Sequence, residues 1–130
     1  MAALDTDILT SLLKGMPEAA KKIRVLQEDG NRISTTIISA YELLKGAYIS
    51  SIAEENLLKV RDSISNLQVL ELSMGATEEA SRIYKELRER GRQIGEFHML
   101  IAGIVKFHDE SLVTRDEHFK LIRGMKVINW

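Results

Sequence analysis

Short strand-like segments alternate with amphipathic helices along the chain, and this alternation constrains the fold more than any other feature. The clearest strand is Ile33–Ile38 (ISTTII), in which every residue but one serine is β-branched. The other strand-like segments are Ala2–Leu4, Gln68–Leu72, Ser111–Thr114 and Lys126–Ile128. Strands separated by helices usually pair in parallel and are covered by helices on both faces. The pattern predicts one α/β domain over residues 1–130, with a mostly parallel central sheet.

Helical periodicity fills the segments between these strands. The expected helices begin after Asp7 and at Pro17, span Ser39–Ile49, Glu54–Ser65 and Ala76–Arg90, and continue with a more apolar helix from Phe97 and a brief one at Asp116. Ser39 and Glu42 have the S-x-x-E spacing of a capping box. This spacing predicts that the third helix begins at Ser39.

Composition excludes several kinds of site. The chain has no cysteine, so disulfides, thiolate metal sites and cysteine nucleophiles are excluded. The net charge of −1 gives no global attraction to a polyanion, so nucleic-acid binding would need local basic groups or a bound metal. No apolar run approaches the roughly 20 residues of a membrane helix, and the N-terminus lacks the pattern of a signal peptide. We therefore expect a cytoplasmic protein with no membrane partner.

Acidic and polar residues follow several of the expected strands. Asp5 follows the first strand, Glu42 the second and Asp116 the fourth, while Glu96 and His98 open the helix before that fourth strand. The carboxyl ends of parallel strands meet at one edge of a sheet, where sites form. Converging carboxylates suit a hard divalent cation, and such a cation supports phosphodiester hydrolysis. Each acid also has a structural alternative as a helix cap or as a first-turn acid that favours the helix dipole.

Several segments of the chain are similar to motifs that occur together in one protein family. The opening LDTDIL (Leu4–Leu9) is similar to the family's LDTNIL, and Ile38–Gly46 resembles the segment in which a glutamate precedes L-x-x-G. IGEFHMLIAG (Ile94–Gly103) resembles the helix start with an aspartate before LIAA, and LVTRDEHF (Leu112–Phe119) is similar to LVTRNxxHF. The ending Met125–Trp130 also fits. These segments occur in the family's order and cover nearly the whole chain. On these motifs the chain resembles the PIN domain family, and most closely its VapC-type toxins of type II toxin–antitoxin pairs.

The resemblance implies a PIN-like three-layer fold, usually dimeric, and Mg²⁺- or Mn²⁺-dependent endoribonuclease activity that a cognate antitoxin holds in check. Position by position, it implies that Asp5 is a direct metal ligand and that Glu42 and Asp116 complete the acidic pocket. Thr6 and Thr114 would orient Asp5 and the water or phosphate. RNA would be the substrate, and the antitoxin a protein partner.

His98 departs from the family pattern, because it stands where a second metal-coordinating aspartate is usual. Histidine can bind Mn²⁺ but is a poor ligand for Mg²⁺. Three outcomes follow: Glu96 or His98 substitutes for the aspartate, the activity requires Mn²⁺ or a softer metal, or the chain is a PIN scaffold that binds antitoxin or RNA without cutting. His108 and His118 have no zinc-site spacing with His98, so no structural zinc site is expected.

Other residues have two interpretations each. Arg115 beside the acidic pocket is a candidate for holding a phosphate, with an ion pair to a neighbouring acid as the alternative. Tyr41, Tyr48 and Ile52 lie in the helical hairpin that clamps the antitoxin in the family, and core packing is their alternative. A receiver-like signalling domain also gathers aspartates at strand ends, but the order of acids here and the lack of a clear closing lysine argue against it.

Overall fold

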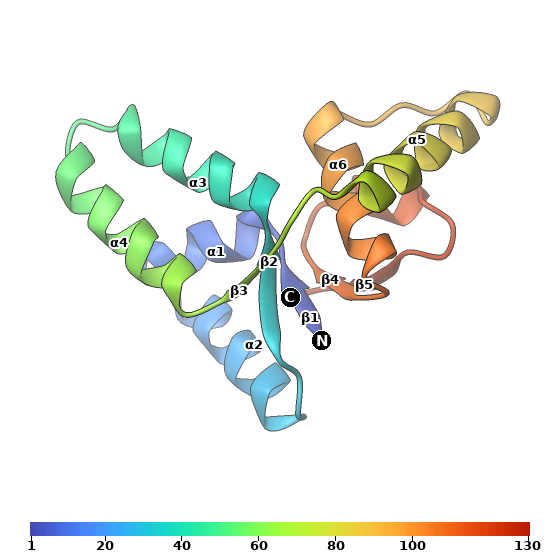
Figure 1. The fold of residues 1–130 in the computed structure, drawn as a ribbon. Coiled ribbons are helices and arrows are strands. Elements are labelled where there is room, and N and C mark those ends of the chain that lie inside the picture. Colours follow the sequence, from blue (N-terminus) through green and yellow to red (C-terminus); the bar gives the residue numbers. More distant parts are fainter.

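The strands form one parallel sheet between two layers of helices (Figure 1) in the computed structural model, which describes residues 1–130. The strand order is β3-β2-β1-β4-β5, and every neighbouring pair is parallel. The strands are β1 (Ala2–Leu4), β2 (Ile33–Thr36), β3 (Gln68–Leu70), β4 (Ser111–Val113) and β5 (Lys126–Ile128). The helices are α1 (Thr6–Leu13), α2 (Pro17–Glu28), α3 (Ile37–Tyr48), α4 (Ala53–Ser65), α5 (Met74–Glu89), α6 (Glu96–Phe107) and the 3-10 helix η1 (Glu117–Leu121). The expected three-layer α/β fold is confirmed.

Each face of the sheet has its own hydrophobic core. Ala2 and Leu4 of β1 pack into the cluster formed with α1, α2, α3 and α4, whereas Ala3 packs into the cluster formed with α5 and α6. Figure 1 shows these two groups of helices on opposite sides of the sheet. The alternation follows from the period of two along a strand, and the sheet is buried on both faces as a parallel sheet requires.

Close packing of α5 against α6 depends on a glycine. A Cβ atom added at Gly103 of α6 would lie 2.6 Å from Ala80 Cβ and 2.7 Å from the Ala76 carbonyl oxygen, both on α5. The small side chains of Ala76 and Ala80 leave room for no more than a glycine opposite them. Because α6 also carries His98, this contact helps to place a residue of the candidate site.

The start of α3 differs from the expected position. The helix begins at Ile37, because the Thr36 hydroxyl caps it by accepting a hydrogen bond from the Ser39 backbone N–H at 3.1 Å. The predicted extension of the second strand to Ile38 and the predicted capping box of Ser39 and Glu42 are therefore wrong. Threonine favours strands and also caps helices, so one side chain ends β2 and begins α3. As a result Glu42 lies in the second turn of α3 and is free to face another element.

The observed start of the fifth helix also differs from the predicted one. The fifth helix begins at Met74 rather than at Ala76, because the Ser73 hydroxyl accepts the Ala76 N–H at 3.1 Å. None of the helices is both long enough and apolar enough to cross a membrane.

The chain reverses its direction of travel across the sheet between β1 and β4. From β1 it adds β2 and β3 on one side, and it returns to place β4 and β5 on the other. The central strand β1 and its neighbour β4 are further joined by the Asp5 N–H, which donates to the Val113 carbonyl at 3.0 Å. Such a switch point leaves a crevice at the carboxyl ends of the strands, where ligands bind in parallel α/β folds.

Candidate active site

Asp5 lies at the end of β1 and is the N-cap of α1. Its carboxylate is held at both oxygens, by the Thr6 backbone N–H at 2.8 Å and by the Thr114 hydroxyl at 2.7 Å. Burial raises the pKa of Asp5 to about 6, the charges of Asp7 and Glu42 add to this rise, and the two hydrogen bonds oppose it. A buried carboxyl group that is crowded by other acids binds a proton or a cation more readily than an exposed one does.

Thr6 joins the first and third helices at the edge of the site. Its hydroxyl donates to Glu42 Oε1 at 2.8 Å, and the Ser39 hydroxyl lies 3.0 Å away. Thr6 and Glu42 are far apart in the chain, so the bond sets the position of the Glu42 carboxylate relative to Asp5. Thr6 therefore positions both acids, the first through its backbone N–H and the second through its hydroxyl.

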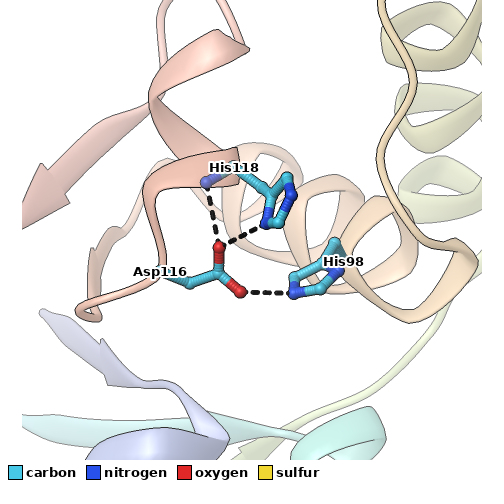
Figure 2. A group of neighbouring side chains, drawn as sticks. All are labelled: His98, Asp116 and His118. Carbon is cyan, nitrogen blue, oxygen red and sulfur yellow. Dashed lines mark hydrogen bonds and ion pairs between the residues drawn. The ribbon is translucent and has the colours of Figure 1, made fainter.

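Asp116 follows β4 and begins η1 as its N-cap, with Oδ1 accepting the His118 backbone N–H at 2.9 Å. The same carboxylate contacts two imidazoles, with His98 Nε2 2.6 Å from Oδ2 and His118 Nδ1 2.6 Å from Oδ1 (Figure 2). Burial alone would raise the pKa of Asp116, but hydrogen bonds from His118 and His98 outweigh it and lower the pKa. Asp116 therefore stays ionised while Asp5 retains a proton more easily.

A cavity of about 250 Å³ brings these residues together. Its lining residues are Asp5, Thr6, Asp7, Glu42, Phe97, His98, Ile101 and Asp116. Four of them are acids, and no lysine or arginine lines the cavity to neutralise them. Oxygen donors that converge without a basic side chain fit a hard divalent cation. The histidine adds a nitrogen donor of the kind that Mn²⁺ and other transition ions accept.

Asp7 accepts hydrogen bonds that connect three segments of the chain, and its position in the sequence did not predict these bonds. Its carboxylate accepts the backbone N–H groups of Ile8 at 2.6 Å and Arg115 at 2.7 Å, and the Trp130 indole N–H at 3.2 Å. These bonds fasten the start of α1 to the loop after β4 and to the end of the chain. Asp7 lines the cavity, but most of its acceptor capacity is already used.

Arg115 does not line the cavity. Its guanidinium pairs with Glu18 at 2.8 Å, donates to the Trp130 carbonyl at 2.6 Å and stacks 3.6 Å from the centre of the Trp130 ring. Arg115 therefore forms an ion pair with a nearby acid, which is the alternative to phosphate binding that the sequence left open. Thr114 is buried, and it contacts Asp5 as its position suggested.

Glu96 lies apart from the other acids. It is the first residue of α6, and it lines hollows formed with Tyr84 and Met99 rather than the acidic cavity. Residues two apart at a helix start point in different directions, so His98 faces the cavity and Glu96 does not. The structure thus brings together Asp5, Glu42, His98 and Asp116.

His118 is the site residue that sequence reasoning missed. It has no regular spacing with His98, and the contact arises only because η1 turns directly after Asp116. The available signal was the D-x-H spacing of Asp116 and His118, since an N-cap aspartate accepts the N–H of the second residue after it. That bond also brings the His118 ring back onto the Asp116 carboxylate.

Comparison with known proteins decides the family. The model of the PIN domain family matches residues 2–125 of the chain. The chain belongs to the PIN domain family. This PIN domain is 30% identical over 128 residues to the tRNA(fMet)-specific endonuclease VapC of Salmonella typhimurium, a match that covers 98% of the chain and 96% of that protein. It is 28% identical, with the same coverage of both chains, to the protein of that name from Shigella flexneri.

A solved relative has nearly the same backbone. The VapBC2 complex of Rickettsia felis, bound to a DNA fragment from its promoter, contains a chain that superposes with a TM-score of 0.92 at 27% identity. The match covers 99% of this PIN domain and 98% of that chain. The resemblance found in the sequence is therefore confirmed at the level of the family and of the fold.

Proposed function

We propose that this PIN domain is a divalent-metal-dependent endoribonuclease and the toxin of a toxin–antitoxin pair. The observation that carries the proposal is the convergence of Asp5, Glu42, His98 and Asp116 on one cavity at the switch point of the sheet. The relatives named above as tRNA(fMet)-specific endonucleases support RNA as the substrate class.

Asp5, His98 and Asp116 would hold the ion. The carboxylates of Asp5 and Asp116 suit Mg²⁺ or Mn²⁺, and the His98 nitrogen suits Mn²⁺ better than Mg²⁺. When bound, such an ion would lower the pKa of a water molecule and offset the charge of the scissile phosphate. Thr114 and the Thr6 N–H hold the Asp5 carboxylate in one orientation. Glu42 also lines the cavity, where the Thr6 hydroxyl fixes its carboxylate, and its role in the proposal is to accept a proton from the attacking water. No serine or cysteine lines the cavity, and the one hydroxyl side chain there, Thr6, is assigned to positioning Glu42, so the proposal uses no protein nucleophile.

Growth of a host cell tests this proposal against the non-cutting scaffold. Expression of the chain alone should arrest growth, and Asp5→Asn should restore it at equal protein level. Val25→Glu, a change on the exposed side of α2, serves as the matched control and should remain toxic. Equal growth arrest by the native chain and by Asp5→Asn would instead favour a scaffold that acts by binding.

A protein partner is part of the same proposal. The hairpin of α3 and α4 exposes large apolar side chains: Tyr41, Tyr48, Ile49, Ile52 and Leu58. A groove between α1, α3 and α4, lined by Leu13, Leu43 and Val60, runs beside them. Exposed large apolar side chains grouped on one hairpin are typical of a protein interface. The relatives of known structure are VapBC complexes, which supports an antitoxin as the occupant.

We also propose that the chain forms a homodimer. On the opposite layer, Met74 of α5 is 78% exposed and Phe107 of α6 is 50% exposed. The Phe107 ring lies against Gly75, so the two side chains belong to one apolar area. Sedimentation velocity should give a dimer for the native chain and a monomer for Met74→Glu; a native monomer at micromolar concentration would contradict the proposal.

A further inference from the structure

Three side chains at the wall of the cavity form a cluster of their own. His98 of α6 approaches Asp116 and His118, which lie at the start of η1 (Figure 2). Each can offer one ligand atom, and these three atoms all lie within 4.8 Å of one another. Two imidazole nitrogens and a carboxylate oxygen are the donors of many transition-metal sites.

We propose that His98, Asp116 and His118 together hold a first-row transition-metal ion, and that this PIN domain therefore prefers such an ion to Mg²⁺. This inference rests on the proposed metal-dependent function, and it adds His118 to the ligands while naming the class of cation. The carboxylate of Asp116 contacts one nitrogen of each ring, and Asp116 also lines the cavity, so the ion would lie at the cavity wall.

The His98 ring is held in place by its surroundings. The edge of the fully buried Phe119 ring supports His98 at a centroid distance of 5.2 Å, and the His98 and His118 centroids are 5.3 Å apart. Gly95 gives the His98 ring its room, because a Cβ atom at that position would lie 3.1 Å from His98 Nδ1. Packing of this kind orients ligands before the metal arrives and reduces the entropy lost on binding.

Coordination requires only small movements. Donors bound to one ion at about 2.1 Å lie roughly 3 to 4 Å from one another. The two imidazoles are now 2.6 Å from the Asp116 oxygens, where an ion would replace the hydrogen bonds. Each of these contacts would have to lengthen by roughly 0.5 to 1.5 Å to admit the ion.

The donor type decides the preference among ions. Mg²⁺ requires oxygen ligands in near-ideal octahedral geometry, and two imidazoles do not supply them. Affinity of nitrogen donors rises from Mn²⁺ through Co²⁺ to Ni²⁺ and Cu²⁺. The three ligands of this cluster leave at least one coordination position open for Asp5 or for a water molecule, as in catalytic rather than structural metal sites.

Titration with Co²⁺, followed by visible absorption, tests the proposal without reference to RNA cleavage. The native chain should bind one Co²⁺, and excess Mg²⁺ should not displace it. His98→Ala and His118→Ala should each weaken Co²⁺ binding by at least about tenfold. His108→Ala is the matched control, because His108 contacts the Ile104 carbonyl and lies outside the cluster, and it should bind Co²⁺ like the native chain.

Two further variants separate a lost ligand from a lost fold. His118 is 56% exposed, so His118→Asn should unfold at the native temperature and still bind Co²⁺ weakly. His98→Asp replaces a nitrogen donor by oxygen and should shift the preference toward Mg²⁺. Native Co²⁺ affinity in His118→Asn, or displacement of Co²⁺ by equal Mg²⁺, would overturn the inference. If cleavage in Mg²⁺ still depended on Asp5 in that case, the proposed nuclease function would remain supported although the metal preference would not.

Discussion

Asp5 combines burial, two fixed hydrogen bonds and crowding by other carboxylates in one residue. Its pKa of about 6 lies above the value of 3.8 that it would have in an unfolded chain. Between these two pH values the folded protein retains a proton that the unfolded chain has released. Stability therefore falls as pH rises through this window, because the native state binds more protons there.

We predict that the metal-free protein loses up to roughly 3 kcal/mol of unfolding free energy between pH 4 and pH 7 through this group. Urea unfolding at a series of pH values measures the loss, and Asp5→Asn should remove most of it. Added Mn²⁺ should stabilise the protein more at pH 7 than at pH 5, because proton and cation compete for the carboxylate. An equal Mn²⁺ effect at both pH values would contradict this interpretation of Asp5.

At the residue scale the sequence predicted which acids meet, but not the contacts that hold them. Asp5, Glu42 and Asp116 follow recognisable strand ends, so their meeting could be expected from a parallel sheet. The His118 contact depends on how the chain turns after Asp116, and periodicity carries no such information. The first turn of α6 sets the direction of the Glu96 side chain. Residue spacing alone could not show whether Glu96 or His98 faces the cavity.

Among the elements, α5 and α6 approach each other closely at Gly103, which has no Cβ atom to keep them apart. We predict that Gly103→Ala destabilises the fold by about 1 to 3 kcal/mol, because the added methyl group meets backbone and side-chain atoms of α5. Gly46→Ala in α3 is the matched control, since a Cβ atom there meets nothing within 4 Å. It should stabilise the fold by up to about 1 kcal/mol through helix propensity. Thermal unfolding of both variants measures these changes in stability. A change of the same sign in both variants would contradict the prediction.

Element boundaries show where sequence patterns compete. The segment Ile33–Ile38 reads as one β-branched strand, and local propensity alone favours its full length. The strand ends at Thr36, because the Thr36 hydroxyl caps the following helix. The helix that begins there places Glu42 within hydrogen-bond distance of Thr6. Propensity describes each residue separately, whereas the cap depends on the geometry of the turn.

For the whole molecule, the alternation of strands and helices was sufficient to predict a parallel three-layer fold. This alternation could not predict the order of the strands in the sheet, because the order depends on which helices cover which face. That order places β1 beside β4 and so gathers Asp5, Thr114 and Asp116 from opposite ends of the chain. The apolar surface on α3 and α4 is likewise a property of the folded chain, since core packing was the equal alternative for those side chains.

This exposed surface leads to a prediction about neutralisation. Leu58 of α4 is 69% exposed, so Leu58→Glu should leave the unfolding temperature nearly unchanged. It should abolish rescue of growth by the co-expressed antitoxin, because a charge would be buried at the apolar interface. Val25→Glu on α2 is the control and should still be rescued. Rescue of Leu58→Glu at the native level would place the antitoxin elsewhere.

The central claim is that the acidic cavity cuts RNA with a divalent metal. The measurement that tests it most directly is cleavage of a mixed RNA pool by the purified chain, with Mg²⁺, Mn²⁺ or chelator, beside Asp5→Asn and His98→Asp. We predict metal-dependent cleavage that is greater with Mn²⁺ than with Mg²⁺, a loss of at least about a hundredfold in Asp5→Asn, and improved use of Mg²⁺ by His98→Asp. If the native chain cuts with neither metal while His98→Asp does, the native fold serves binding alone and the central claim is contradicted.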